Sequence, residues 1–258
     1  MSENTEVSYS EQENTPSYLR RRLILFLLFI IIVLTATALT IPTMVNRTHK
    51  PAIYLYSDES VVVSLKLDNL LLKDIVIPNY SNGWSILVKK DGWLSDLKPE
   101  KTDCSKLPDG FGFEYAKEAC RTNDYPYIYW DGTTFKKLPQ KHLGWFVKKE
   151  DFEEFLNQKS DEMGMNKAEK SEFVRYWTYK TANYPANGFW IYFLQNEEVD
   201  KYIKLKVSPM PQSWNRVQIV ITPESASKTS LPYPLKKITR EGLTLVEWGG
   251  VIKKKAVK

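Results

Sequence analysis

The sequence predicts an α+β protein, with an N-terminal transmembrane helix followed by a mainly antiparallel β domain (sheet or sandwich) that contains an inserted helical hairpin. Three patterns predict this fold class. Residues 23–41 carry no charge. Many later segments alternate apolar and polar side chains with a period of two, which is typical of half-buried strands. Around residues 150–180 the apolar period changes to that of an amphipathic helix.

The uncharged segment is long enough to cross a bilayer. Its nineteen residues would form a helix of about 28 Å, close to the ~30 Å thickness of the hydrocarbon core. Three arginines at positions 20–22 stand directly before it, whereas only Arg47 and Lys50 follow it closely. Because the more basic flank of a span stays in the cytoplasm, we expect a single-pass protein of the cell membrane with a cytoplasmic N-terminus.

This orientation divides the chain into four parts. We expect a disordered cytoplasmic tail over residues 1–22, the membrane helix over 23–41, a linker over 42–50 and an extracytoplasmic domain over 51–258. The small residues Ala36-Thr37-Ala38 leave a second interpretation open, in which the segment is a signal peptide cleaved after Ala38. The apolar run continues beyond this point and favours an uncleaved signal-anchor. Both interpretations predict that the same domain is exported.

Two cysteines, Cys104 and Cys120, lie in the polar stretch of the exported part. In an oxidising compartment such a pair predicts one disulfide, which would stabilise the fold by ~3 kcal/mol in the chain-entropy account. In a reducing compartment both would be free thiols. Two cysteines without further ligands nearby do not make a zinc site, so no metal is expected.

The first part of the domain predicts an antiparallel meander. Residues 61–68 alternate in period two, and Asp91-Gly92 predicts a hairpin between residues 84–89 and a strand that begins at Trp93. The remaining strands are expected at residues 52–56, 70–77, 125–130, 144–147, 189–194, 203–207, 217–221 and 243–248. Asp131-Gly132 predicts another hairpin, and residues 95–124 and 223–241 are expected to be irregular.

The helical hairpin is predicted from its start and stop signals. The first helix covers residues 150–163 and ends at Gly164, which suits the left-handed conformation. Asn166 and Glu169 form a capping-box pattern that opens the second helix. This helix is expected to run to about Tyr179. Its predicted inward-facing residues are Ala168, Phe173, Tyr176 and Trp177.

Several motifs of this domain resemble a group of uncharacterised bacterial exported proteins that begin with the pattern KPxIYLYP. The motifs are Lys50-Pro51-Ala52-Ile53-Tyr54-Leu55-Tyr56, Gly83-Trp84, Tyr129-Trp130-Asp131-Gly132, Glu172-Phe173-Val174-Arg175-Tyr176-Trp177, Val207-Ser208-Pro209-Met210-Pro211 with Arg216-Val217, and Glu247-Trp248-Gly249-Gly250. Ser57 departs from the pattern, where the group tends to have proline. The resemblance implies a bacterial envelope protein and brings no assigned activity.

Enzymatic function has little support in the sequence. Of the two histidines, His49 follows the predicted span closely, and His142 lies in a polar segment without a nucleophile motif nearby. No Walker loop, dinucleotide fingerprint or H-E-x-x-H motif is present, so no cofactor is expected. The open alternative is a carboxylate-dependent glycan or peptide hydrolase of the envelope. Glu172 and Glu247 are the candidate catalytic acids, because aromatic neighbours could raise their pKa values.

A binding module agrees better with the composition. The chain has eight Trp and fifteen Tyr, and its 36 basic residues are scattered among 31 acidic ones, which gives no support for nucleic-acid binding. Exposed aromatic faces would bind a glycan or an envelope protein. The candidate binding residues at predicted strand ends and turns are Trp84, Trp93, Trp130, Trp145 and Trp214, and core packing is the alternative role for each of them.

Overall fold

The computed structural model describes residues 17–40, 46–68, 71–98, 102–134 and 136–253, and the chain divides into two compact units, Met1–Thr43 and Met44–Lys258. The first unit contains helix α1 (Ser17–Thr40), whose side chains are described only in part. Residues 17–22 were predicted to be disordered and instead belong to α1, because leucine and arginine favour helix. Residues 1–16, Ile41 and the side chains of Ala36, Thr37 and Ala38 lie outside the described part.

Helices long and apolar enough to cross a membrane are not found among the described residues.

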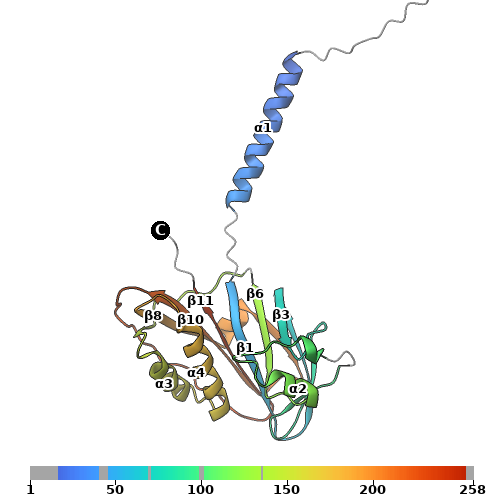
Figure 1. Ribbon diagram of the computed structural model, residues 1–258, viewed down its shortest axis with the longest axis vertical. Coiled ribbons are helices and arrows are strands. Elements are labelled where there is room, and N and C mark those ends of the chain that lie inside the picture. The colour runs from blue at the N-terminus through green and yellow to red at the C-terminus, as the bar shows by residue number, and fades with distance from the viewer. Residues whose placement is uncertain (1–16, 41–45, 69–70, 99–101, 135, 254–258) are drawn as a thin grey trace, which may run out of the picture. The chain divides into compact units, whose positions relative to one another are not determined.

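The second unit is built on a seven-stranded sheet (Figure 1). Its strands are β1 (Asn46–Tyr56), β3 (Leu71–Ile77), β6 (Ile128–Thr134), β7 (Trp145–Lys148), β8 (Gly188–Gln195), β10 (Ser213–Glu224) and β11 (Thr244–Ile252). Their spatial order is β3-β6-β1-β11-β10-β8-β7. All neighbouring pairs are antiparallel except β10 and β11, which are parallel. The predicted α+β class with mainly antiparallel pairing is therefore confirmed.

A four-stranded sheet holds the other strands in the order β5-β4-β2-β9. They are β2 (Val61–Asp68), β4 (Trp84–Val88), β5 (Leu94–Asp96) and β9 (Lys204–Ser208). The predicted hairpin at Asp91-Gly92 joins β4 to β5, with Gly92 at a φ of +83°. The predicted meander is wrong, because β1 and β3 each pair with β6 in the large sheet, while β2 pairs with β4 in the small sheet.

The predicted hairpin at Asp131-Gly132 is also wrong. β6 runs straight through these residues, and Gly132 pairs with Thr48 of β1 on one side and with Leu72 of β3 on the other. A strand with partners on both sides is held extended, so the turn preference of the Asp-Gly pair is overridden. Residues 42–50 were predicted to be a linker, yet β1 already begins at Asn46.

The helical hairpin consists of α3 (Phe152–Glu162) and α4 (Lys167–Thr181). Gly164 has a φ of +72°, and both hydrogen bonds of the capping box between Asn166 and Glu169 are present. Ala168 was predicted to face inward but is exposed, and Glu169 is buried instead. Three short elements fall where no helix was predicted: the 3-10 helix η1 (Cys104–Lys106), α2 (Ala116–Thr122) and α5 (Glu197–Tyr202).

Aromatic side chains join α3 and α4 to one face of the large sheet. Phe173 of α4 meets the ring of Trp248 on β11 at 5.4 Å between centroids, and Phe152 of α3 meets Phe189 of β8 at 4.9 Å. A Cβ added at Gly250 would lie 2.6 Å from the Trp177 ring. Glycine at this position therefore lets α4 approach β11 closely. We call this side of the sheet the helix face.

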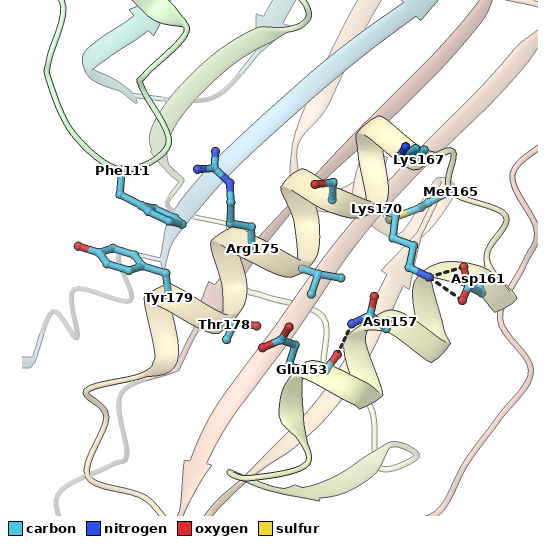
Figure 2. Close-up of a pocket in the computed structure, with 12 residues that line it drawn as sticks. Phe111, Glu153, Asn157, Asp161, Met165, Lys167, Lys170, Arg175, Thr178 and Tyr179 are labelled. Carbon is cyan, nitrogen blue, oxygen red and sulfur yellow. Dashed lines mark hydrogen bonds and ion pairs between the residues drawn. The ribbon is translucent and has the colours of Figure 1, made fainter.

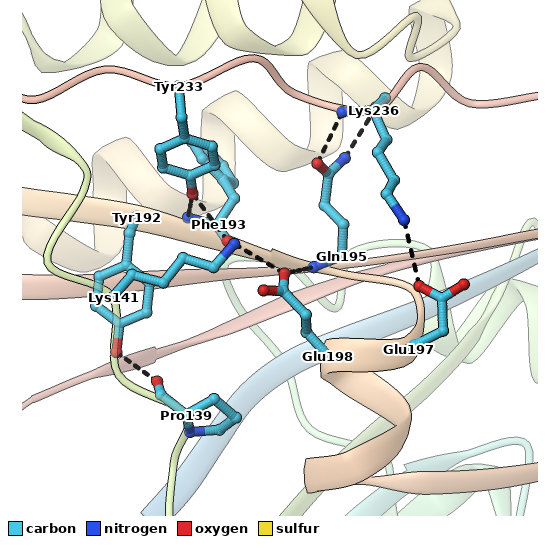
Figure 3. Close-up of polar contacts among 9 residues, drawn as sticks. All are labelled: Pro139, Lys141, Tyr192, Phe193, Gln195, Glu197, Glu198, Tyr233 and Lys236. Carbon is cyan, nitrogen blue, oxygen red and sulfur yellow. Dashed lines mark hydrogen bonds and ion pairs between the residues drawn. The ribbon is translucent and has the colours of Figure 1, made fainter.

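The long connection between β10 and β11 is fixed to β8 by polar contacts (Figure 3). The Tyr233 hydroxyl accepts from the backbone N–H of Phe193 at 2.8 Å and donates to its carbonyl at 2.9 Å. The Gln195 amide exchanges two hydrogen bonds of 2.8 Å with the backbone of Lys236. A parallel pair of strands needs such a crossover, and these contacts hold it against the sheet.

Candidate functional site

The most unusual side chain of the domain is Lys50, which is 1% exposed. It lies in β1, where the register with both β11 and β6 shifts between residues 48 and 52, and it has a φ of +40°. Pro51 follows it directly and restricts its backbone. A lysine with positive φ at a bulge is strained, and such residues concentrate at functional sites.

The Lys50 ammonium group is enclosed by aromatic rings and one carboxylate. Its Nζ lies 2.9 Å from Oε2 of Glu172 on α4. It also lies 5.1 Å from the ring centroid of Tyr176, 5.7 Å from that of Tyr127 and 5.8 Å from that of Trp248. Ring faces stabilise a cation electrostatically, most strongly where water is excluded. These contacts compensate for the buried charge.

A chain of alternating charges connects Lys50 to the surface. The second carboxylate oxygen of Glu172 accepts from Nη2 of Arg175 at 2.7 Å. Nη1 of Arg175 donates to Oε1 of Glu114 at 3.2 Å, and Oε2 of Glu114 accepts from the backbone N–H of Gly112 at 2.8 Å. The loop around Gly112 therefore covers Lys50 and is tied to α4 through Arg175.

Burial and charge pairing have opposite effects on the pKa values of Lys50 and Glu172. Burial lowers the pKa of Lys50, and Glu172 counteracts that shift only in part. Burial alone would raise the pKa of Glu172, but Lys50 and then Arg175 outweigh it, so that this pKa lies below its ordinary value. Burial also lowers the pKa of the neighbouring His49 to about 4, assisted by Lys180 and Arg47. Glu172 is thus a fixed anion at neutral pH and not a proton donor.

Next to Arg175, a groove of about 840 Å³ runs along the surface between α3 and α4 (Figure 2). α3 contributes Glu153, Asn157 and Asp161, which are spaced by one helical turn. The α4 wall carries three basic residues, Lys167, Lys170 and Arg175, together with Ser171, Val174, Thr178 and Tyr179, while Met165 lies in the turn between the helices. The charged residues are thus acidic on one wall and basic on the other.

Stacked side chains form one end of the groove. The ring centroids of Phe111 and Tyr179 are 4.0 Å apart with an interplanar angle of 19°, and the Arg175 guanidinium lies 4.6 Å from the Phe111 centroid. Tyr179 is 58% exposed. Figure 2 shows these three side chains together, away from the ion pair of Lys170 with Asp161 (2.7 Å) that joins α4 to α3.

The structure does not bring the two candidate catalytic acids together. Glu172 approaches the helix face, where Trp248 points. Glu247 precedes Trp248 in β11 without a change of register, so its side chain points to the opposite face. There it pairs with Nε of Arg216 and accepts from Nε1 of Trp130 at 3.1 Å. The two carboxylates cannot flank one substrate.

The five candidate tryptophans have different environments. Trp84, Trp130 and Trp145 are buried in the core, and Trp214 is half-buried with its Nε1 donating to Asp200 at 3.2 Å. Only Trp93 is strongly exposed, at 43%, and it lines a pocket of about 420 Å³ beside α2. Burial therefore corrects the prediction of a binding surface for Trp84, Trp130 and Trp145.

A disulfide joins Cys104 to Cys120 with 5.7 Å between their Cα atoms. The sixteen-position separation encloses Gly110 and Gly112, which have φ values of +105° and +85°. The bond therefore pins the segment that carries Phe111 into the groove and Gly112 over Lys50. The segment predicted to be irregular helps to build the candidate site.

Catalytic machinery is not evident in the described part of the chain. It contains no group of three or more His, Cys, Asp or Glu side chains placed to hold a metal ion. His142 is exposed in a connecting segment. Besides Glu172, the titratable neighbours of Lys50 include Tyr127, whose pKa is raised well above its ordinary value by burial. The arrangement can bind and orient charged groups.

Sequence reasoning missed both Lys50 and the groove. Lys50 was placed in a linker, although a lysine directly before Pro51 and an apolar strand is an unusual start for a core element. The groove residues lie on the outward face of two correctly predicted helices, where polar side chains are ordinary. Only the third element, the loop with Phe111, turns this face into a site.

The chain matches no protein-family model, no curated protein and no solved structure.

Proposed function

We propose that this protein is a single-pass, membrane-anchored protein of the bacterial cell envelope, whose extracytoplasmic domain binds a ligand in the groove between α3 and α4. The observation that carries the proposal is the exposed groove of about 840 Å³ with opposite charges on its walls and the Phe111–Tyr179 stack at one end. Aromatic and arginine side chains concentrate at recognition surfaces. An envelope protein or a glycan would be the partner.

The anchor is supported by the sequence around α1. The uncharged segment of residues 23–41 follows three arginines at positions 20–22, and α1 covers this segment up to Thr40. The resemblance to bacterial exported proteins points to the same location. The disulfide between Cys104 and Cys120 is the kind of bond that persists in oxidising compartments.

Binding is favoured over hydrolysis by the positions of the acids. A glycosidase needs two carboxyl groups on either side of one bond, roughly 5–10 Å apart. Glu172 and Glu247 point to opposite faces of the sheet, and each is paired with a cation. This speaks against the carboxylate-dependent hydrolase.

Site-specific cross-linking tests the proposed binding site. A photo-reactive residue replaces Ser171, which is exposed in the groove, in the full chain expressed in a bacterial host. The matched control carries the same residue in place of Val62, which is exposed on β2 of the small sheet. We expect a discrete adduct from position 171 only. Equal labelling at both positions, or none at position 171, would contradict the proposal.

Fractionation tests the anchor. We expect the full chain to stay with membranes after alkaline carbonate extraction and its domain to be cut by protease added to spheroplasts. The control carries Phe26→Lys and Ile30→Lys, which cost about 5–7 kcal/mol together at the centre of a bilayer. Release of the unmodified chain, or a mature N-terminus near Leu39, would overturn the anchor.

A further inference from the structure

The ends of the groove between α3 and α4 carry opposite charges without partners. At one end, the exposed Glu153 on α3 has no ion pair with any described side chain. At the other end the same holds for Lys167, the first residue of α4, within the described ranges. The charges between them are engaged: Lys170 with Asp161, and Arg175 with Glu172 and Glu114.

The relative levels of the residues on α3 and α4 set the distance between Glu153 and Lys167 along the groove. The ion pair of Lys170 with Asp161 places these two residues at the same level of the antiparallel hairpin. Eight residues earlier in α3, Glu153 therefore lies near the level of Thr178. Along α4, the eleven residues from Lys167 to Thr178 correspond to about 16 Å at about 1.5 Å per residue.

An extended peptide has the dimensions of this groove. Residues four positions apart in a strand lie about 13 Å apart and point to the same side, and side-chain length covers the remaining distance. The side chain midway between them would point to the floor, where Val174 offers apolar surface. Any ligand that reaches from Lys167 to Glu153 passes over the Lys170–Asp161 ion pair, which joins the two walls with an N–O distance of 2.7 Å, and an extended chain is narrower there than a helix of about 10 Å diameter.

We infer that the groove binds an extended peptide segment with an acidic and a basic side chain four positions apart and an apolar side chain midway. The carboxylate lies at Lys167, the ammonium or guanidinium group lies at Glu153, and the apolar side chain contacts Val174. The inference rests on the proposed function and names its ligand class. The neutral hydroxyls of a glycan would leave both end charges without an oppositely charged partner.

Blocked pentapeptides test this ligand class on the full chain in detergent micelles. The dipolar peptide has an acid first, a leucine third and a lysine fifth, and the comparison peptide has the same composition with both charges next to the leucine. We expect the dipolar peptide to bind about fivefold more tightly, since one well-placed exposed ion pair is worth up to about 1 kcal/mol. Equal affinities, or no binding of the dipolar peptide at about 1 mM, would overturn the inference.

Charge reversal at one end makes the test specific. Glu153→Lys gives both ends a positive charge, so that this variant should prefer a peptide with acids at both ends and bind the dipolar peptide about tenfold more weakly. The matched control is Glu154→Lys, an exposed neighbour outside the groove lining, which should bind like the unmodified chain. Unchanged preference in Glu153→Lys would contradict the inference.

The two proposals can fail separately. If position 171 cross-links to a partner but the pentapeptides show no preference, the groove is a binding site and the peptide class is wrong. If position 171 labels no better than position 62, the binding function itself is wrong. Sequencing of the cross-linked peptide provides the direct comparison with the expected charge spacing.

Discussion

Two buried ion pairs lie on opposite faces of the large sheet and differ in how they are built. Arg216 and Glu247 occupy paired positions on neighbouring strands, and both side chains are 0% exposed. Lys50 and Glu172 come from a strand bulge and a helix, and the Glu172 side chain is 23% exposed. The first pair is enclosed by rigid strands, whereas the second continues through Arg175 to the groove.

This difference indicates which charges serve the fold and which can respond to a ligand. Arg216 also pairs with Asp200 at 2.6 Å and donates to the carbonyl of Ile203 at 2.6 Å, and none of these partners lines the groove. Arg175 contacts Glu114 and the Phe111 ring on the disulfide-bonded loop, and Glu172 on its own helix α4. A ligand at Arg175 would therefore act on the loop and the helix together.

The largest expected loss of stability follows from breaking the enclosed ion pair of Arg216 and Glu247. Glu247→Ala removes the carboxylate from Arg216 and from Nε1 of Trp130, leaving a buried guanidinium with Asp200 as its charged partner. We expect a loss of about 3–5 kcal/mol in the free energy of unfolding. Urea unfolding of the purified variant measures it. A loss below 1 kcal/mol would show that the Arg216–Glu247 pair does not stabilise the fold more than the Lys50–Glu172 pair does.

Removal of the disulfide should have the next largest effect. The double change Cys104→Ser and Cys120→Ser frees the sixteen-position loop and should cost ~3 kcal/mol by the chain-entropy account. Because the loop carries Phe111 and Gly112, groove binding should weaken as well. Reductant added to the unmodified chain should reproduce both effects. A loss of stability with unchanged binding would show that the loop does not shape the groove.

His49 should make the stability of the domain depend on pH. Burial lowers its pKa from 6.5 to about 4, so the unfolded chain takes up the proton first as the pH falls. The stability is therefore fully present above pH 6.5 and is lost as the pH falls towards 4, by about 2 kcal/mol after allowance for solvent screening. Thermal unfolding at several pH values should show a flatter profile for His49→Asn. Parallel profiles would contradict this origin.

The smallest expected effect is that of Glu172→Gln. The amide keeps the shape and one hydrogen bond to Lys50 but loses the charge that Lys50 and Arg175 share. Since the pKa of Glu172 lies below its ordinary value, its contribution is present above pH 4.5 and is lost as the pH falls through the folded pKa. We expect a loss of about 1–2 kcal/mol at pH 7 and none at low pH. Denaturant titrations at both pH values measure it, and Glu114→Gln, at the exposed end of the charge chain, is the control.

Local patterns predicted the elements well. β2 was predicted over residues 61–68 and extends over Val61–Asp68, and the capping box of α4 is formed as expected. Strand alternation and helix caps are encoded by neighbouring residues, so they can be identified without knowledge of the tertiary structure. Pairing partners are different: nothing in the sequence near β11 indicates that it lies between β1 and β10.

The candidate site could be predicted only in its parts. Glu172 was singled out for its aromatic surroundings, which the structure shows, but its partner Lys50 was assigned to a linker. Trp130 and Trp145 are chemically suited to binding, and only their burial shows that they belong to the core. A groove requires three segments to meet, and the third, with Phe111, has no regular pattern.

The position of β1 has a consequence for the order in which the protein can form. β1 lies between β6 and β11, and β11 begins only at Thr244. While the chain is being synthesised, the centre of the sheet must wait for nearly the last residues of the domain, and pairings so distant in sequence form slowly. The large sheet would thus remain incomplete until β11 has been synthesised. With the export proposed above, its completion would follow translocation.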